Sequence, residues 1–236
     1  KKELPYFKES ADLFESISDR YWAVMLDSGP KENRCGRYDI LTADPFVTLV
    51  TRGDSTEVVS GETHFSSTAD PFFLLKEKLG PVETIDSELP FSGGAIGYFG
   101  YDLGRRIENL PTIAEDDEAL PEMAIGIYDW ALVVDHDNCR SWLVSAGRNP
   151  KTKMHWAALI TLFSKISKPI KRTKFQVTEK VKSSLSYAQY ADAFQRIQDY
   201  IGNGDCYQVN FAQRFQIACE GDPWLAYRQL RKINPA

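Results

Sequence analysis

The segment from Met123 to Gly147 constrains the fold more than any other part of the sequence. It reads MAIGIYDWALVVDHDNCRSWLVSAG, in which two apolar stretches flank a polar turn at residues 135–138. This pattern predicts two strands joined by the turn. The first stretch is apolar without alternation, which predicts a strand covered on both faces. We therefore expect a buried hairpin inside a sheet that other elements cover.

Further strands are predicted on the amino-terminal side of this hairpin. Residues 21–28 and 37–53 are rich in β-branched and aromatic side chains, and residues 56–67 suit a hairpin that turns at Ser60-Gly61. A helix fits residues 70–80, with Asp70 as its cap, Pro71 in its first turn and Gly80 at its end. We expect its apolar side to face the sheet.

A second helix is predicted over residues 149–168, where Trp156, Ile160 and Phe163 recur at helical spacing. Residues 169–185 are polar, rich in lysine and without a stripe, and are interpreted as a linker. The predicted organisation is an amino-terminal subdomain over 1–168, this linker, and the truncated start of another domain over 186–236.

The last part of the chain begins with a capping box formed by Ser186 and Gln189. An apolar stripe follows on one predicted helix, which the glycines at 202 and 204 end. Residues 206–219 alternate apolar and polar side chains as a strand does, and residues 222–234 repeat the Asp-Pro helix start. The stripe consists of Tyr190, Phe194, Ile197 and Ile201.

Charge and composition exclude several classes of partner. The net charge of −5 argues against a protein that binds the phosphate backbone of nucleic acid. No apolar run approaches the ~20 residues that span a bilayer, and no signal peptide is visible. Four scattered cysteines without Cys-x-x-Cys spacing favour reduced thiols in a cytoplasmic protein over a disulfide or zinc framework.

The stretch FSGGAIGYFGYDLGRR, residues 91–106, contains four glycines within eight positions. A phosphate-binding loop is one interpretation, but this stretch follows a turn, its spacers are bulky, and no Gly-Lys-Ser/Thr ending is present. We favour a strand whose glycines allow close packing beneath aromatic rings, followed by a short helix that Asp102 caps and that carries Arg105 and Arg106. The acidic run at 115–118 is interpreted as a solvated loop, so no metal site is predicted in this chain.

Three long motifs together carry a family resemblance. FSGGAIGYFGYDLGRRIENLP, MAIGIYDWALVVDHD and GDCYQVNFAQRF resemble the amino-terminal half of the aminodeoxychorismate synthase component I enzymes, a branch of the chorismate-binding family. Anthranilate synthases of the same family usually carry a small apolar residue at the position of Asn210. Anthranilate synthase component I and a non-catalytic docking or scaffold role remain the alternatives.

The resemblance implies a fold and a reaction. The expected fold is α+β, with large, mainly antiparallel sheets in a layered sandwich, helices on the outer faces, and an incomplete core. A full-length member converts chorismate and ammonia to 4-amino-4-deoxychorismate, the precursor of 4-aminobenzoate and folate. It uses Mg²⁺, a nucleophilic lysine that we expect beyond Ala236, and ammonia from a glutamine amidotransferase subunit. The chain alone is therefore expected to be inactive.

The resemblance also implies two sites in this chain. Relatives that add water to chorismate carry a lysine as general base at the position of Gln208; a neutral amide cannot deprotonate water but still hydrogen-bonds ammonia. We predict that Gln208 contacts the substrate, with an ordinary strand residue as the alternative. The second site is a pocket for L-tryptophan, in which Ser28 accepts from the ammonium, with two strand ends and a turn as the structural alternative. Its other residues are Cys35, Gly36, Arg37 and Tyr38.

Overall fold

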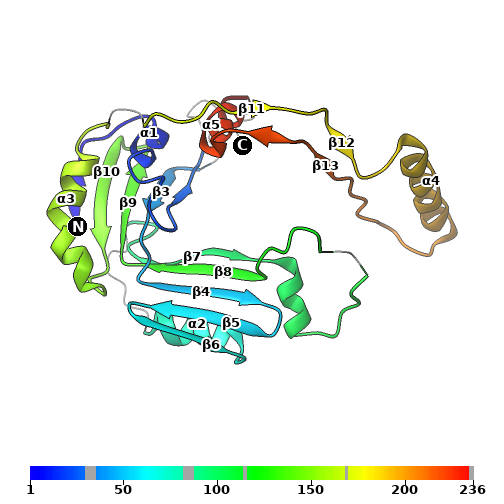
Figure 1. Ribbon diagram of the computed structural model, residues 1–236, viewed down its shortest axis with the longest axis horizontal. Coiled ribbons are helices and arrows are strands. Elements are labelled where there is room, and N and C mark those ends of the chain that lie inside the picture. The colour runs from blue at the N-terminus through cyan, green and yellow to red at the C-terminus, as the bar shows by residue number, and fades with distance from the viewer. Residues whose placement is uncertain (30–35, 82–87, 114–115, 168–169, 234–236) are drawn as a thin grey trace. The chain divides into compact units, whose positions relative to one another are not determined.

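The computed structural model describes residues 1–29, 36–81, 88–113, 116–167 and 170–233 (Figure 1). Its described residues form two compact units, one within Lys1–Ile170 and the other over Lys171–Asn234. The first unit contains two five-stranded sheets, and every pair of neighbouring strands in them is antiparallel. The predicted α+β class with antiparallel sheets is confirmed.

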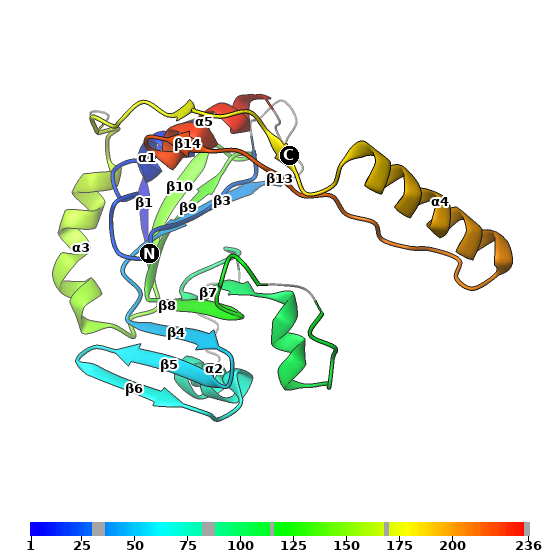
Figure 2. The same cartoon turned by 45° about the vertical axis from the view of Figure 1, so that its right-hand side comes forward.

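The first sheet has the order β1-β10-β9-β3-β2. Its middle strand β9 is buried along its whole length, and β10, β9 and β3 lie side by side in both ribbon views (Figures 1 and 2). Helix α3 contacts β1 and β10, and the Phe163 ring of α3 lies 5.9 Å from the Trp130 ring of β9. The bounds are β1 Lys2–Leu4, β2 Val24–Leu26, β3 Tyr38–Thr42, β9 Trp130–Asp135, β10 Arg140–Ser145, α1 Ser10–Phe14 and α3 Pro150–Phe163.

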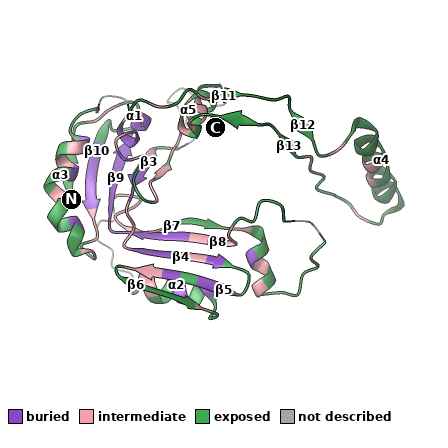
Figure 3. Ribbon diagram, viewed as in Figure 1, coloured by how far each residue is buried: buried purple, intermediate pink, exposed green. Residues whose placement is uncertain are grey.

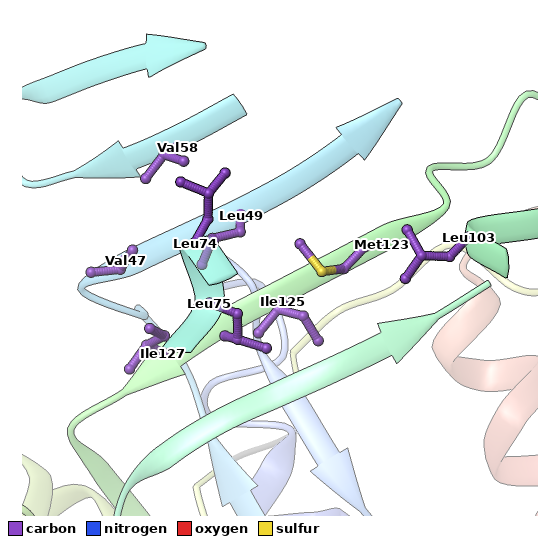
Figure 4. Close-up of a cluster of buried hydrophobic side chains, with 9 residues drawn as sticks. All are labelled: Val47, Leu49, Val58, Leu74, Leu75, Leu103, Met123, Ile125 and Ile127. Carbon is purple, nitrogen blue, oxygen red and sulfur yellow. The ribbon is translucent and has the colours of Figure 1, made fainter. Parts of the chain in front are cut away.

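The second sheet has the order β6-β5-β4-β8-β7, and helix α2 packs on one of its faces. Figure 4 shows Leu74 and Leu75 of α2 among the side chains of β4, β5 and β8, which together form a buried cluster. The predicted contact between the apolar side of this helix and the sheet is confirmed. The bounds are β4 Val47–Arg52, β5 Ser55–Ser60, β6 Thr63–Ser67, α2 Pro71–Leu79, β7 Gly94–Phe99 and β8 Met123–Tyr128.

The apolar segment from Met123 to Gly147 forms three strands rather than the two expected. Its second half is the predicted hairpin of β9 and β10, but its first half, β8, belongs to the other sheet. The chain passes between the sheets at Asp129, which is 2% exposed. The Asp129 carboxylate accepts hydrogen bonds from the Ser145 hydroxyl at 3.0 Å and the Arg148 amide at 2.6 Å, so its charge is solvated by protein donors. A buried acid inside the apolar run was the signal for this break.

The glycine stretch forms the edge strand β7 and the 3-10 helix η2, Tyr101–Arg106. A Cβ atom on Gly97 would lie 2.0 Å from the carbonyl oxygen of Ala124 in β8, so this strand pair closes only with glycine there. The glycine packs against backbone and not beneath rings, since Tyr98 and Tyr101 are exposed. The predicted cap was also wrong, because Gly100 occupies the cap position and Asp102 accepts from Arg105 Nε at 2.8 Å.

Two helix predictions were confirmed, with one correction. The Asp70 carboxylate caps α2 by accepting from the Phe73 amide at 2.8 Å. Helix α3 spans Pro150–Phe163, but the side chains it buries are Thr152, Leu159 and Phe163. Trp156 and Ile160, which the predicted stripe included, are only partly buried. The buried face of α3 is therefore narrower than the spacing predicted, and it includes the polar side chain of Thr152.

The second unit contains two helices and four strands of two residues each. The capping box at the start of α4, Tyr187–Asn203, is present as predicted, and Gly204 in the left-handed conformation ends the helix. Neither α4 nor α5, Pro223–Ile233, has a buried residue among those described (Figure 3). Residues 206–219 do not form the predicted strand, because only two short bridges pair this segment with others. The short strands are β11 Gln176–Val177, β12 Lys182–Ser183, β13 Phe215–Gln216 and β14 Cys219–Glu220.

Two further observations concern the described residues alone. None of their helices has the length and apolar composition to cross a membrane. Among their cysteines, Cys139, Cys206 and Cys219 carry free thiols.

Candidate functional site

Strand β2 pairs with β3 in the antiparallel sense, so the segment after β2 lies beside the segment before β3. Leu26 pairs with Ile40, so Ser28, just after β2, lies opposite the residues that lead into β3. A Cβ atom on Gly36 would lie 2.8 Å from the Ser28 Cβ atom. Only glycine therefore lets these two segments approach so closely. Cys35, the remaining turn residue of the predicted tryptophan pocket, lies outside the described residues.

Ser28 is held by the side chain of Asp39 in β3. Both the amide and the hydroxyl of Ser28 donate to Asp39 Oδ1, each at 2.8 Å. Because a serine hydroxyl has one proton and two lone pairs, this bond leaves only its acceptor capacity for another group. Ser28 is thus set to accept a hydrogen bond from a donor such as an ammonium group.

Asp39 is fully buried and belongs to a polar network that the sequence analysis did not find. Its Oδ2 atom lies 2.7 Å from Nε2 of the buried His136. The Ser10 hydroxyl of α1 lies 3.3 Å from the same Nε2 atom. On the other side of the ring, His136 Nδ1 lies 3.0 Å from the Tyr6 hydroxyl. Nε2 donates to the carboxylate and Nδ1 pairs with the Tyr6 hydroxyl, so both ring nitrogens have hydrogen-bond partners.

The electrostatics of Asp39 follow from this environment. Burial raises the pKa of its carboxyl, but hydrogen bonds from His136, Ser10 and Ser28 to the charged form outweigh burial and bring the pKa to about 2. Asp39 is therefore ionised at neutral pH. An acid that interrupts the apolar sequence of β3 was the one signal that could have revealed this network.

Arg37 is engaged within the protein. Its Nε and Nη2 atoms donate to the two oxygens of Asp135 at 2.9 and 2.5 Å, a bidentate pair. This bonding raises the pKa of Arg37 and lowers that of Asp135. The guanidinium carbon also lies 4.7 Å from the centre of the Tyr38 ring. Arg37 thus ties the start of β3 to the end of β9 and does not point a free charge at a ligand.

The structure brings some of the predicted pocket residues together and separates others. Ser28 and Gly36 are in contact, whereas Tyr38 packs against the apolar cluster of Ile40, on the face of the strand opposite to Asp39. Gln208 belongs to the second unit, is exposed, and donates through Nε2 to Asn210 Oδ1 at 3.5 Å. Neither placement tests the predicted roles of these residues.

Comparisons with known proteins identify the family. The family model described as "chorismate binding enzyme" matches residues 23–236. The chain is 42% identical to aminodeoxychorismate synthase component 1 of Klebsiella aerogenes over 99% of this chain and 51% of that protein. It is also 42% identical to the protein of the same name from Escherichia coli K12, over 94% of this chain and 48% of that one.

A solved structure shows the same architecture. Anthranilate synthase component I from Streptococcus pneumoniae matches with a TM-score of 0.68 at 25% identity, over 90% of this chain and 48% of that one. The chain thus spans about half the length of the proteins that it matches. The family model covers most of the chain and agrees with the three motifs on which the resemblance rests. This chain belongs to the chorismate-binding enzyme family.

Proposed function

We propose that the chain is the amino-terminal part of an aminodeoxychorismate synthase component I, as the resemblance of its motifs implied. The observation that carries this proposal is 42% identity to two bacterial enzymes of that name across nearly the whole chain. The anthranilate synthase of known structure is 25% identical. The full-length protein would convert chorismate and ammonia to 4-amino-4-deoxychorismate and water, with ammonia supplied by a glutamine amidotransferase subunit in the cytoplasm.

Gln208 is proposed to act at the reacting centre of that protein. Its amide has no basicity at neutral pH, so it cannot activate water, but its oxygen accepts from ammonia and its nitrogen donates to a hydroxyl. Its exposure leaves the amide accessible, and its one weak contact to Asn210 does not fix it elsewhere.

The 4-amino-4-deoxychorismate that the full-length protein forms would be converted to 4-aminobenzoate, which would serve folate synthesis.

The proposed magnesium ion finds no site among the described residues. No three histidine, cysteine, aspartate or glutamate side chains of those residues gather closely enough to hold a metal ion. The described residues therefore do not by themselves supply the ligand set of a magnesium ion. In the proposed enzyme Mg²⁺ would be bound by other residues of the full-length protein.

A regulatory L-tryptophan pocket beside Ser28 is the finer part of the proposal. Ser28 supports it, because the bond to Asp39 uses the hydroxyl proton and leaves lone pairs for the ligand ammonium. Calorimetry on the full-length protein should show tryptophan binding that Ser28→Ala weakens, whereas Ser66→Ala, at an exposed hydroxyl of β6, leaves it unchanged. Absence of any tryptophan binding would remove this part.

Two alternatives remain testable alongside the proposal. An anthranilate synthase of the same fold would release 2-aminobenzoate from chorismate. A docking or scaffold role is favoured by the second unit, whose described helices expose apolar side chains such as Phe194 and Leu230. The test is chorismate consumption with ammonia and Mg²⁺ by the full-length protein and by the isolated chain. Consumption by the full-length protein alone, with 4-amino-4-deoxychorismate as the product, supports the proposal, whereas release of 2-aminobenzoate or turnover by the isolated chain contradicts it.

A further inference from the structure

A cavity of about 530 Å³ lies in the first unit, away from the residues of the candidate site. It is bounded by β4 and β5 of the second sheet, by Trp130 at the start of β9, and by the first turns of α3. None of Ser28, Gly36, Arg37 and Tyr38 lines it. Its volume is in the range of sites that hold small organic molecules.

Two threonines line this cavity, and no described residue hydrogen-bonds to their hydroxyls. Thr48 of β4 is 4% exposed and Thr152 of α3 is 5% exposed. Val47 and Leu49 point to α2 in the cluster of Figure 4, so the alternation of a strand turns Thr48 to the opposite face, where the cavity lies. Among the described residues the one fully buried hydroxyl without a partner is that of Ser141, so the two threonine hydroxyls are open to the cavity and can donate to a polar ligand there.

The charges of the lining residues indicate the sign of the charge that the ligand carries. Arg20 is paired with Asp44 at 2.9 Å, and Asp44 is the only acidic residue among the described residues of the lining. Arg148 donates to the carbonyl of Lys78 and lies over the Phe46 ring at 5.2 Å, but no described carboxylate lies within ion-pair distance of it. Lys151 likewise has no ion pair among the described residues. The cavity therefore has an excess of positive charge.

The start of α3 adds to this potential. Asn149 caps the helix by accepting from the Lys151 amide at 3.1 Å, so the positive end of the helix dipole lies at the cavity wall. The remaining wall is apolar and partly aromatic, with Phe46, Trp130 and Leu159. A ligand with an anionic group beside Arg148 and Lys151 and an apolar body against Phe46 and Trp130 matches both the charged and the apolar parts of the lining.

We propose that this cavity binds a small organic anion in which a carboxylate or a phosphate is joined to an aromatic body. The unpartnered hydroxyls of Thr48 and Thr152 donate to the anion, and Lys151 with Arg148 neutralises it. The proposal does not depend on the reaction of the full-length protein, because it concerns separate residues.

Calorimetric titration of the full-length protein with benzoate, phenyl phosphate and inorganic phosphate tests the proposal. We expect benzoate or phenyl phosphate to bind, and the tighter of the two identifies the head group. Lys151→Gln and Thr48→Val should each weaken that binding roughly tenfold, since each removes a donor to a charged group. Lys153→Gln is the matched control, because it removes the same charge from the same helix turn outside this cavity and should change binding less than about twofold.

Three results would overturn the proposal. In the first, neither aromatic anion binds. In the second, Lys153→Gln weakens binding as much as Lys151→Gln, which indicates a diffuse charge effect. In the third, inorganic phosphate binds as tightly as phenyl phosphate, so that the apolar wall contributes nothing. Thermal unfolding of each variant checks that the protein is folded, and Thr48→Val retains the shape and strand preference of the original residue.

Discussion

Replacing Asp39 with asparagine gives the sharpest test of the buried network beneath Ser28. Asparagine has the shape of a protonated aspartate, so the substitution removes the charge and leaves the packing. The pKa of Asp39 is about 2 in the folded protein, against an ordinary value of 3.8. That difference makes the ionised carboxylate worth about 2 kcal/mol of folding free energy at neutral pH. Asp39 is completely buried, so solvent screening does not reduce this figure.

The pH dependence carries a sign that can be checked. A carboxyl whose pKa is depressed by folding stabilises the protein above the unfolded-state pKa and loses that contribution as the pH falls through the folded-state pKa. The free energy of unfolding of the wild type should exceed that of Asp39→Asn by about 2 kcal/mol at pH 7 and by about half of that near pH 3. Urea unfolding at a series of pH values measures this difference. Asp54→Asn, at a fully exposed carboxylate, is the control.

A difference between wild type and Asp39→Asn that stays constant from pH 7 to pH 3 would refute the reasoning. It would mean that the loss came from packing or from the neutral hydrogen bonds of the amide. Other carboxyls with lowered pKa values, such as Asp135, also reduce stability in acid. They act equally on both proteins, so the difference isolates Asp39.

Three further predictions follow from single contacts. Gly97→Ala should destabilise the protein by roughly 3 kcal/mol in thermal unfolding, because its Cβ atom would meet the carbonyl of Ala124. Gly202→Ala, in open space on α4, is the control and should be neutral or stabilising. Equal losses for both variants would contradict the close packing of β7 on β8 as the cause. Arg37→Lys should lower the free energy of unfolding, since lysine cannot form the bidentate pair, and unchanged urea unfolding would count against it. Gln208→Lys in the full-length protein should admit water as nucleophile and yield hydroxylated product, so an unchanged product spectrum argues against its proposed role.

Local patterns in the sequence predicted the elements whose ends are set by nearby residues. The Asp70 cap of α2, the capping box at Ser186 and the hairpin of β9 and β10 depend on contacts within a few positions. The class of the fold followed from the family resemblance, and strand runs followed by isolated helices agreed with it. These elements are therefore present as expected.

The errors fall where distant segments decide the structure. The split of the apolar run at Asp129 depends on donors from Ser145 and Arg148, which no local window contains. Residues 206–219 alternate like a strand, but alternation alone gives no partner strand, and only two short bridges form. A strand pattern predicts a pairing surface and not the pairing itself.

The candidate site was predicted in outline and not in its supporting chemistry. The family resemblance selected Ser28 and Gly36, and the structure places them in contact. It gave no indication that Asp39 and His136, 97 positions apart, form the buried pair that orients Ser28. Arg37 was included in the pocket, but its guanidinium is bound to Asp135. Side-chain networks across a sheet depend on register, which the sequence alone does not fix.

We have proposed that this chain comes from an enzyme that aminates chorismate at the 4-position. The most direct measurement is mass spectrometry with chromatography of the product that the full-length protein forms from chorismate, ¹⁵N-labelled ammonia and Mg²⁺. We expect labelled 4-amino-4-deoxychorismate, which a lyase converts to labelled 4-aminobenzoate. Labelled 2-aminobenzoate as the product, or chorismate recovered unchanged, would contradict it.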